Sequence, residues 1–183
     1  GRWAVQQLEE FGVTTDVIID EDRPTTRKTR YRAHNKTLLR LNEFRDHQID
    51  SFISKKILGR VSDYLPEIDL IVFSDFSYGI FSEEMIKKII NSGSKKGVFL
   101  AADSQSSSQI GDICRFPGVD LITPTEREAR LAVRDNVSGL VGVSEKLRSE
   151  TGARFIPITL GSEGVFLHRP DAGVNDWTDD QVP

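Results

Sequence analysis

Residues 123–128 (TPTERE) combine a proline, two threonines and two carboxylates where an apolar run gives way to a helical pattern. Residues 119–122 are typical of the end of a buried strand, and residues 129–133 would form the apolar side of a short helix. Loops at such strand ends bind ligands in open α/β proteins. Thr125 and Glu128 have the spacing of a capping box. The same carboxylate could instead lie beside phosphates and a magnesium ion, and both interpretations remain open.

Two further carboxylates follow buried strand patterns. Asp75 comes just after residues 70–73, and Asp103 comes just after residues 98–101. Both are therefore expected at the rim of the sheet where ligands bind. Either aspartate could simply cap the next helix or turn. With Glu128 at a third strand end, however, the set favours a site for cations or hydroxyl groups.

A pair of glycines, Gly161 and Gly164, follows Thr159 at the end of another apolar run. Glycines in such a turn let backbone amides approach a phosphate or an adenine closely. On spacing alone, a tight hairpin turn is the simpler interpretation. The chain contains neither a Walker A sequence nor the glycine fingerprint of dinucleotide-binding folds, so those two modes of nucleotide binding are excluded.

Basic side chains gather between residues 23 and 40, with no acidic residue among them, although the whole chain has a net charge of −4. They are Arg23, Arg27, Lys28, Arg30, Arg32, Lys36 and Arg40. Alternation along a strand places Lys28, Arg30 and Arg32 on one face, where their fields add. Such a face suits the dianionic phosphate of a small substrate. Charges that prevent unwanted pairing of an edge strand are the alternative explanation.

The periodicity of apolar residues predicts an α/β fold. Strands that alternate with helices after residue 50 indicate a three-layer α/β/α arrangement with a mostly parallel sheet, and residues 70–73 have no polar face, as in a sheet covered on both sides. The basic strands before residue 43 are expected to form a small projecting sheet. We expect helices at 3–11, 51–65, 83–93, 125–133 and 141–151, and strands at 17–19, 25–31, 37–41, 70–73, 98–101, 119–122, 155–158 and 165–167.

Length and composition set further limits. The chain has 183 residues, 28% of them charged, and a single cysteine, Cys114, so it contains no internal disulfide and no cysteine-based zinc site. It has no apolar run long enough to span a membrane, and its acidic balance argues against a nucleic-acid binder. A cytoplasmic protein is the simplest interpretation. The helix at 3–11 has no preceding partner and the last residues close no element, so we expect a domain truncated at both ends.

Four segments, in order, resemble the ribokinase-like (phosphofructokinase-B type) sugar kinases, and among them the D-glycero-β-D-manno-heptose-7-phosphate kinases. Residues 23–41 are similar to the family's lid, and residues 72–79 to its Ser-Asp-Tyr-x-Lys-Gly strand end. Residues 121–128 are similar to its Thr-Pro-Asn-x-x-Glu segment, and residues 158–164 to its Thr-x-Gly-x-x-Gly nucleotide loop. The resemblance implies one kinase domain over 1–183, with a lid at about 14–43 and an α/β core at 50–183.

The resemblance also implies roles for particular residues. Glu128 would order water around the magnesium ion of bound ATP, and nucleotide contacts would come from Thr125, Thr159, Gly161 and Gly164. The phosphosugar would face Lys28, Arg30, Asn35 and Arg40. Asp75 and Asp103 would lie at the rim of the site. The catalytic base would lie beyond Pro183, so the chain by itself should not turn over substrate.

The chain departs from the family's pattern at three places. Thr125 stands where the family has asparagine, Gln105 where it has a lysine near the phosphates, and Tyr78 where its Asp-Tyr-x-Lys-Gly segment has lysine. The expected function is an ATP- and magnesium-dependent kinase of a sugar phosphate, with a possible homodimer through the lid sheet. A non-catalytic sugar- or nucleotide-binding domain of the same fold and, further off, a nucleic-acid-binding module using residues 23–40 remain as alternatives.

Overall fold

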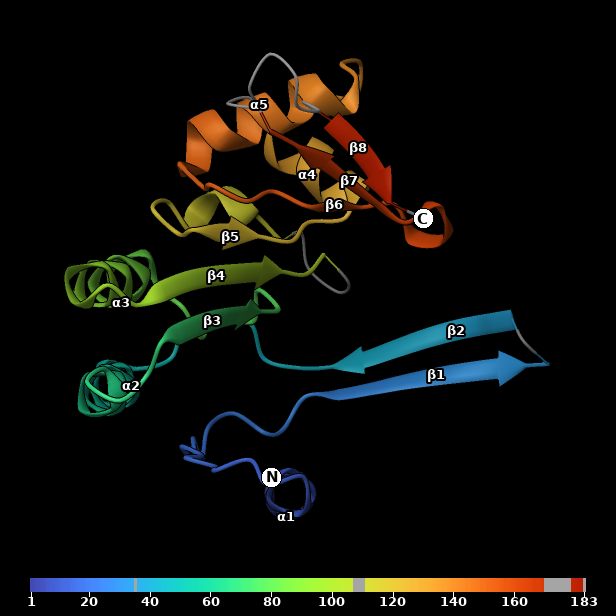
Figure 1. Cartoon of the computed structure of the whole chain (residues 1–183). Helices are drawn as coiled ribbons and strands as arrows, with labels where there is room; N and C mark the ends of the chain where they lie inside the picture. The colour runs from blue at the N-terminus through green and yellow to red at the C-terminus, as the bar shows by residue number, and fades with distance from the viewer. Residues whose placement is uncertain (35, 107–110, 170–178, 183) are drawn as a thin grey trace.

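The structure is a computed structural model that describes residues 1–34, 36–106, 111–169 and 179–182 (Figure 1). Along the chain its helices and strands are α1 (Arg2–Glu10), β1 (Arg27–Ala33), β2 (Lys36–Glu43), α2 (Ser51–Tyr64), β3 (Leu70–Asp75), α3 (Glu83–Lys96), β4 (Phe99–Ser104), η1 (Ile113–Arg115), β5 (Leu121–Ile122), α4 (Glu126–Ala132), α5 (Leu140–Thr151), β6 (Ile158–Thr159), η2 (Gly161–Glu163), β7 (Val165–His168) and β8 (Asp179–Val182). The α/β fold expected from the sequence is therefore present.

The central sheet consists of the parallel strands β3, β4 and β5, as the alternation of strands and helices predicts. Single parallel bridges from Leu121 to Phe155 and from Thr125 to Thr159 join it to the next segment. From there the pairing changes direction, since β6, β7 and β8 form an antiparallel sheet, the C-terminal sheet. The expected parallel arrangement thus holds for β3–β5, whereas the C-terminal strands β6–β8 pair antiparallel.

Local signals position the first two core helices. Asp50 accepts a hydrogen bond from the Ile53 backbone at the start of α2, and Ser82 accepts one from Met85 at the start of α3. The expected end of α3 at Gly93 is wrong, because the helix continues to Lys96 and closes with the left-handed Gly97. Gly93 is needed for packing instead, since a Cβ there would lie 2.8 Å from Leu100 Cδ2. The glycine lets α3 approach β4 closely.

The hydrophobic core lies between the central sheet and the helices α3, α4 and α5. Its largest fully buried side chains include Phe73, Phe116 and Leu147. On β3 only alternate residues are covered: Phe73 is 2% exposed, but Leu70 and Val72 are 50% and 57% exposed. The expectation of a strand covered on both faces is therefore not met by the described residues, which cover one face of β3.

The strands β1 and β2 extend from the body as an antiparallel arm (Figure 1), here called the lid sheet. This confirms the projecting sheet. The strand expected at 17–19 is wrong, because that segment is irregular. Its apolar residues have the propensity of a strand but pair with no strand among the described residues. Asp16, just before them, forms an ion pair with Arg60 of α2 at 3.1 Å. Within the described residues, no helix combines the length and the apolar character that crossing a membrane requires.

Candidate active site

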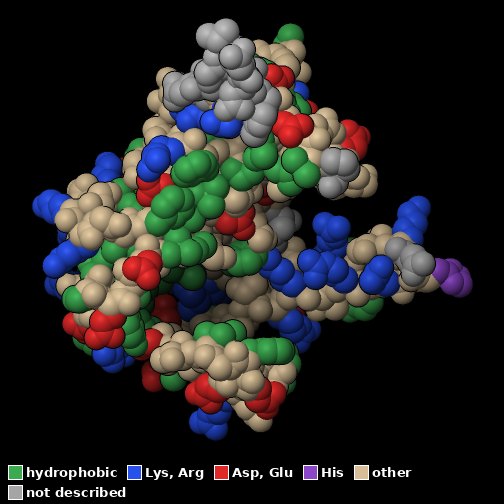
Figure 2. Space-filling model, viewed as in Figure 1, with side chains coloured by type: hydrophobic (Ala, Val, Ile, Leu, Met, Phe, Trp, Pro, Cys, Tyr) green, Lys and Arg blue, Asp and Glu red, His purple; other side chains and the backbone are tan. Residues whose placement is uncertain are grey.

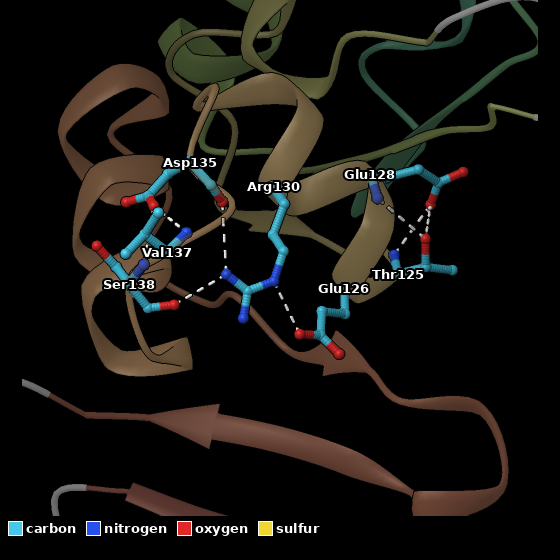
Figure 3. A network of polar contacts seen from close by, with 7 residues as sticks. All are labelled: Thr125, Glu126, Glu128, Arg130, Asp135, Val137 and Ser138. Atoms are coloured by element: carbon cyan, nitrogen blue, oxygen red, sulfur yellow. Dashed lines mark hydrogen bonds and ion pairs between the residues drawn. The ribbon is translucent and has the colours of Figure 1, made fainter.

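The carboxylate of Glu128 links two loops at the carboxyl edge of the central sheet. Its Oε2 accepts hydrogen bonds from the Thr125 backbone (2.9 Å) and the Thr125 hydroxyl (2.8 Å), which completes the expected capping box with the Glu128 amide (Figure 3). Its Oε1 accepts a 2.7 Å hydrogen bond from the Ser106 backbone, in the loop after β4. The capping interpretation is thus confirmed. The Ser106 contact goes beyond it, since a cap alone needs only one oxygen.

The two other strand-end carboxylates have different surroundings. Asp103 is partly exposed and lies close to the hydroxyl of Thr123 (3.5 Å) and the amide of Gln105 (3.4 Å), on the same edge as Glu128. Asp75 is 3% exposed and forms an ion pair with Arg115 at 3.2 Å, so it does not lie on an open rim. We assign Asp75 a structural role, because a buried carboxylate already paired with a guanidinium is not available to a ligand.

The residues present fit a magnesium ion only through an indirect contact. No cluster of three metal-ligating side chains occurs in the part of the chain that the structure describes. Magnesium, however, usually keeps several waters and takes one or two carboxylates together with substrate phosphates. A single carboxylate such as Glu128, fixed by three backbone and hydroxyl donors, suits that arrangement.

The turn between β6 and β7 lies beside Thr125. The bridge from Thr125 to Thr159 and the hydrogen bond from the Thr159 amide to Pro124 (2.9 Å) bring the two segments together. Gly161 and Gly164 both have positive φ, at 64° and 88°, conformations that glycine adopts without steric penalty. A Cβ at Gly161 would meet no atom within 4 Å, so its backbone is open to approach from outside. The four residues expected at the nucleotide therefore share one edge.

The basic residues of the lid sheet divide between its two faces. Arg30 pairs across the strands with Arg40, and Lys28 with Asn42, so Lys28, Arg30 and Arg40 share a face. Figure 2 shows Lys and Arg side chains on the side of this arm that faces the C-terminal sheet across an open notch. The fourth residue expected at the sugar, Asn35, lies outside the described residues.

Arg23 belongs to the basic cluster by sequence but not by position. Its guanidinium donates hydrogen bonds to the backbone oxygens of Arg45 (2.9 Å), Tyr78 (2.5 Å) and His47. The carbonyls of Arg45 and His47 lie on the segment that joins β2 of the lid sheet to α2, and that of Tyr78 lies on the core loop between β3 and α3. Arg23 thus fixes the base of the lid sheet, a role that charge and spacing in the sequence did not indicate.

A second polar network holds the helix that contains Glu128 (Figure 3). Arg130 of α4 donates to Glu126 (2.8 Å) and to the Ser138 carbonyl (2.8 Å). The buried Asp135 accepts hydrogen bonds from the Val137 and Ser138 amides and forms an ion pair with Lys146 of α5. The network fixes the connection between α4 and α5, and nothing in the sequence marked it beforehand.

This network predicts an acid-dependent loss of stability. The hydrogen bond from Lys146, followed by those from Ser138 and Val137, holds the pKa of Asp135 well below its ordinary value of 3.8. A lowered folded-state pKa stabilises the protein fully above the unfolded pKa, and that contribution is lost as the pH falls toward the folded pKa. Asp135→Asn should therefore lower the urea midpoint at pH 7, and the difference from the native chain should shrink below about pH 4.

Urea unfolding between pH 2.5 and 7 measures this effect. Asp22→Asn, in the exposed segment before the lid sheet, is the matched control and should shift the midpoint little at any pH. A difference between Asp135→Asn and the native chain that stayed constant down to pH 2.5 would contradict the assignment of the ion pair.

The sequence profile of the pfkB family of carbohydrate kinases matches residues 1–176. The chain belongs to the pfkB family. The matched residues include the lid sheet, the central sheet and the first two strands of the C-terminal sheet.

Among individual pfkB relatives, the chain is 28% identical over 171 residues to the bifunctional protein HldE of Helicobacter hepaticus, and 30% identical over 170 residues to that of a Nitratiruptor species. Each match covers 91% of this chain but 35% of the relative. The chain therefore spans about a third of the length of the curated relatives that it matches.

Solved structures show the same fold at low identity. Ribokinase from Giardia lamblia superimposes with a TM-score of 0.69 at 15% identity, covering 99% of this chain and 54% of that one. Phosphofructokinase-2 from Escherichia coli, in complex with potassium, gives a TM-score of 0.59 at 14% identity and covers 79% of this chain and 45% of that one. The ribokinase-like fold expected from the sequence is thereby confirmed.

Proposed function

We propose that this chain is part of an ATP- and magnesium-dependent kinase that transfers the γ-phosphoryl group to a hydroxyl of a phosphorylated sugar. The bridge between Thr125 and Thr159 is the main support, because it places Glu128 and the Gly161–Gly164 turn on one edge of the sheet. The basic face of the lid sheet provides the cations that a phosphosugar requires. The resemblance to D-glycero-β-D-manno-heptose-7-phosphate kinases makes heptose 7-phosphate the first substrate to test.

Phosphoryl transfer depends mainly on positioning and charge neutralisation, so each group has a distinct part. The amides of the turn would contact the nucleotide phosphates, and Glu128 would hold water of the magnesium ion. That ion would neutralise charge on the transferred phosphoryl group. Lys28, Arg30, Asn35 and Arg40 would bind the sugar phosphate. The resemblance to the family implies a general base supplied from outside residues 1–183.

An assay on the full-length protein tests this function directly. With ATP, magnesium and heptose 7-phosphate, we expect ADP release that depends on all three, with a new phosphate ester seen by phosphorus NMR. Calorimetric binding of ATP and sugar phosphate without ADP release would instead identify a non-catalytic binding domain of the same fold. The departures at Thr125 and Gln105 make that comparison necessary.

We also propose that the lid sheet forms a homodimer contact. The face opposite the basic one presents Tyr31, Leu39 and Leu41, all exposed. A two-stranded sheet is at most marginally stable alone in water, and the same apolar face of a second copy would cover it in a two-fold arrangement.

Sedimentation velocity should then show a dimer that Leu39→Asp weakens by about tenfold or more, because a charge would have to be buried in the contact. Val137→Asp, at an exposed position between α4 and α5, is the control and should leave the dimer intact. A native protein that sediments as a monomer at micromolar concentration would exclude this contact.

A further inference from the structure

Three aromatic rings stack where the lid sheet joins the core. Phe44 follows β2 and stacks on Tyr78 with ring centroids 4.6 Å apart, and Phe76 follows β3 and stacks on Tyr78 at 6.0 Å. Both pairs are inclined by 21°, so the rings are nearly parallel. The stack therefore connects the lid sheet to the segment that resembles the family's strand end, but with Tyr78 in the position of its lysine.

The ammonium group of Lys28 lies on this stack. Its Nζ is 4.2 Å from the centroid of the Phe76 ring and 5.4 Å from that of Tyr78. Both distances are within the range in which a cation is attracted to an aromatic face. Lysine side chains ordinarily move among many rotamers, so the two rings restrict where this charge can lie.

A hollow opens at the same place. It has a volume of about 290 Å³ and is lined by Thr26, Lys28, Phe76 and Tyr78. Tyr78 is only 8% exposed, and its buried hydroxyl has no hydrogen-bond partner in the described part of the chain. A buried tyrosine hydroxyl normally has a partner. The lining of the hollow thus includes a lysine ordered by aromatic rings and a tyrosine whose buried hydroxyl has no hydrogen-bond partner in the described residues, and both side chains can bind the oxygens of a phosphate or a sugar.

The position of the hollow fits the rest of the basic face. Lys28 shares that face with Arg30, which lies two residues further along β1, and with Arg40, which pairs across from Arg30. An anionic group bound at Lys28 would therefore lie at the base of the lid sheet, where the Arg23 hydrogen bonds hold lid and core together. Binding to a cation that is already ordered loses less conformational entropy than ordering a mobile one.

We propose that Phe76 and Tyr78 are positioning residues that hold the Lys28 ammonium for the phosphate of the sugar substrate, and that the Tyr78 hydroxyl donates a hydrogen bond to an oxygen of that substrate. This inference rests on the proposed sugar-phosphate kinase function. It adds two residues to the substrate site and explains how the site works with tyrosine at position 78.

Kinetics of the full-length protein with heptose 7-phosphate test the positioning role. Phe76→Leu removes the aromatic face and should raise KM for the sugar phosphate about fivefold, with kcat changed less than twofold. Phe76→Tyr should restore KM, since it restores the ring. Lys28→Met should raise KM at least as much as Phe76→Leu, and the double variant should be no worse than Lys28→Met alone, because the rings act through Lys28.

Tyr78→Phe isolates the hydroxyl. It keeps the stack and should raise KM for the sugar phosphate about fivefold, the effect of one lost hydrogen bond. Phe52→Leu, at an exposed position on α2, is the control and should leave KM unchanged. The urea midpoint of every variant shows whether a changed KM reflects the site or a loss of folding.

Calorimetry with heptose 7-phosphate and with the unphosphorylated heptose separates this inference from the kinase function. An active kinase whose KM is unaffected by Phe76→Leu, or in which the effects of Phe76→Leu and Lys28→Met multiply, overturns the positioning role alone. Binding of the sugar phosphate that weakens in both variants, without turnover by the native protein, supports the positioning role and overturns the kinase. A native protein that neither binds nor phosphorylates the sugar phosphate overturns both.

Discussion

Glu128→Gln is expected to reduce kcat of the full-length kinase about a hundredfold or more at saturating ATP and magnesium, while the free energy of unfolding falls by only about 1 kcal/mol. Glutamine has nearly the same shape, and its one oxygen can still accept the hydrogen bonds that Thr125 donates, whereas the bond from the Ser106 amide is lost because the glutamine NH2 group is itself a donor. The negative charge that would hold the water of the magnesium ion is lost. The two functions of this carboxylate, capping and charge, are therefore separable in one substitution.

Glu126→Gln is the matched control for this prediction. Glu126 lies in the same first turn of α4, but its carboxylate pairs with Arg130 and not with the loop after β4. Glu126→Gln should lower the free energy of unfolding about as much as Glu128→Gln does, but it should change kcat less than threefold. If both variants lowered kcat equally, or if Glu128→Gln left kcat unchanged, Glu128 would be a helix cap and no more.

Gly79→Ala is expected to destabilise the fold by about 2–5 kcal/mol, a large loss for an exchange that adds one methyl group. Gly79 has φ of 79°, and a Cβ there would lie 2.2 Å from the His47 carbonyl oxygen and 2.7 Å from that of Asp46. Both atoms are backbone and belong to the segment that leaves the lid sheet. The methyl group would force this segment away, together with the hydrogen bond from the Ile49 amide to the Gly79 carbonyl (3.0 Å).

Gly97→Ala separates the two causes of that loss. Gly97 has a nearly identical φ of 74°, but a Cβ there would meet nothing within 4 Å. Its substitution should therefore cost only the backbone penalty, about 1–2 kcal/mol. Urea unfolding of both variants gives the comparison. If the two variants lost equal free energy of unfolding, the segment at His47 would move away from the added methyl group without strain. The close packing of Gly79 against this segment would then not stabilise the base of the lid sheet.

The amino-acid sequence by itself determined the features that depend on neighbours a few residues apart. The starts of α2, α3 and α4 followed from Asp50, Ser82 and Thr125, because a capping side chain bonds to the backbone of its own first turn. The hairpin of the lid sheet followed from alternation and a polar turn. Four motifs in the same order as in a kinase family predicted the ribokinase-like fold, and the family profile and the solved structures confirm it.

Local patterns failed where a distant contact decides the structure. Residues 17–19 have apolar β-branched side chains, but no strand in the described part of the chain pairs with them, and they form no strand themselves. Gly93 has the residue type of a helix end, yet its place against Leu100 keeps it inside α3. In each case the deciding atom belongs to another element.

Only the tertiary structure decided how the candidate site residues are used. Glu128 bonds to Ser106 outside its own helix, and Asp75 is buried in an ion pair with Arg115. Arg23, a member of the basic cluster by sequence, bonds to backbone carbonyls at the base of the lid sheet. Thr125 lies beside Thr159, and Lys28 lies on the ring of Phe76. These contacts join residues far apart in the chain, and their energies depend on burial and direction, which residue types and spacing do not specify.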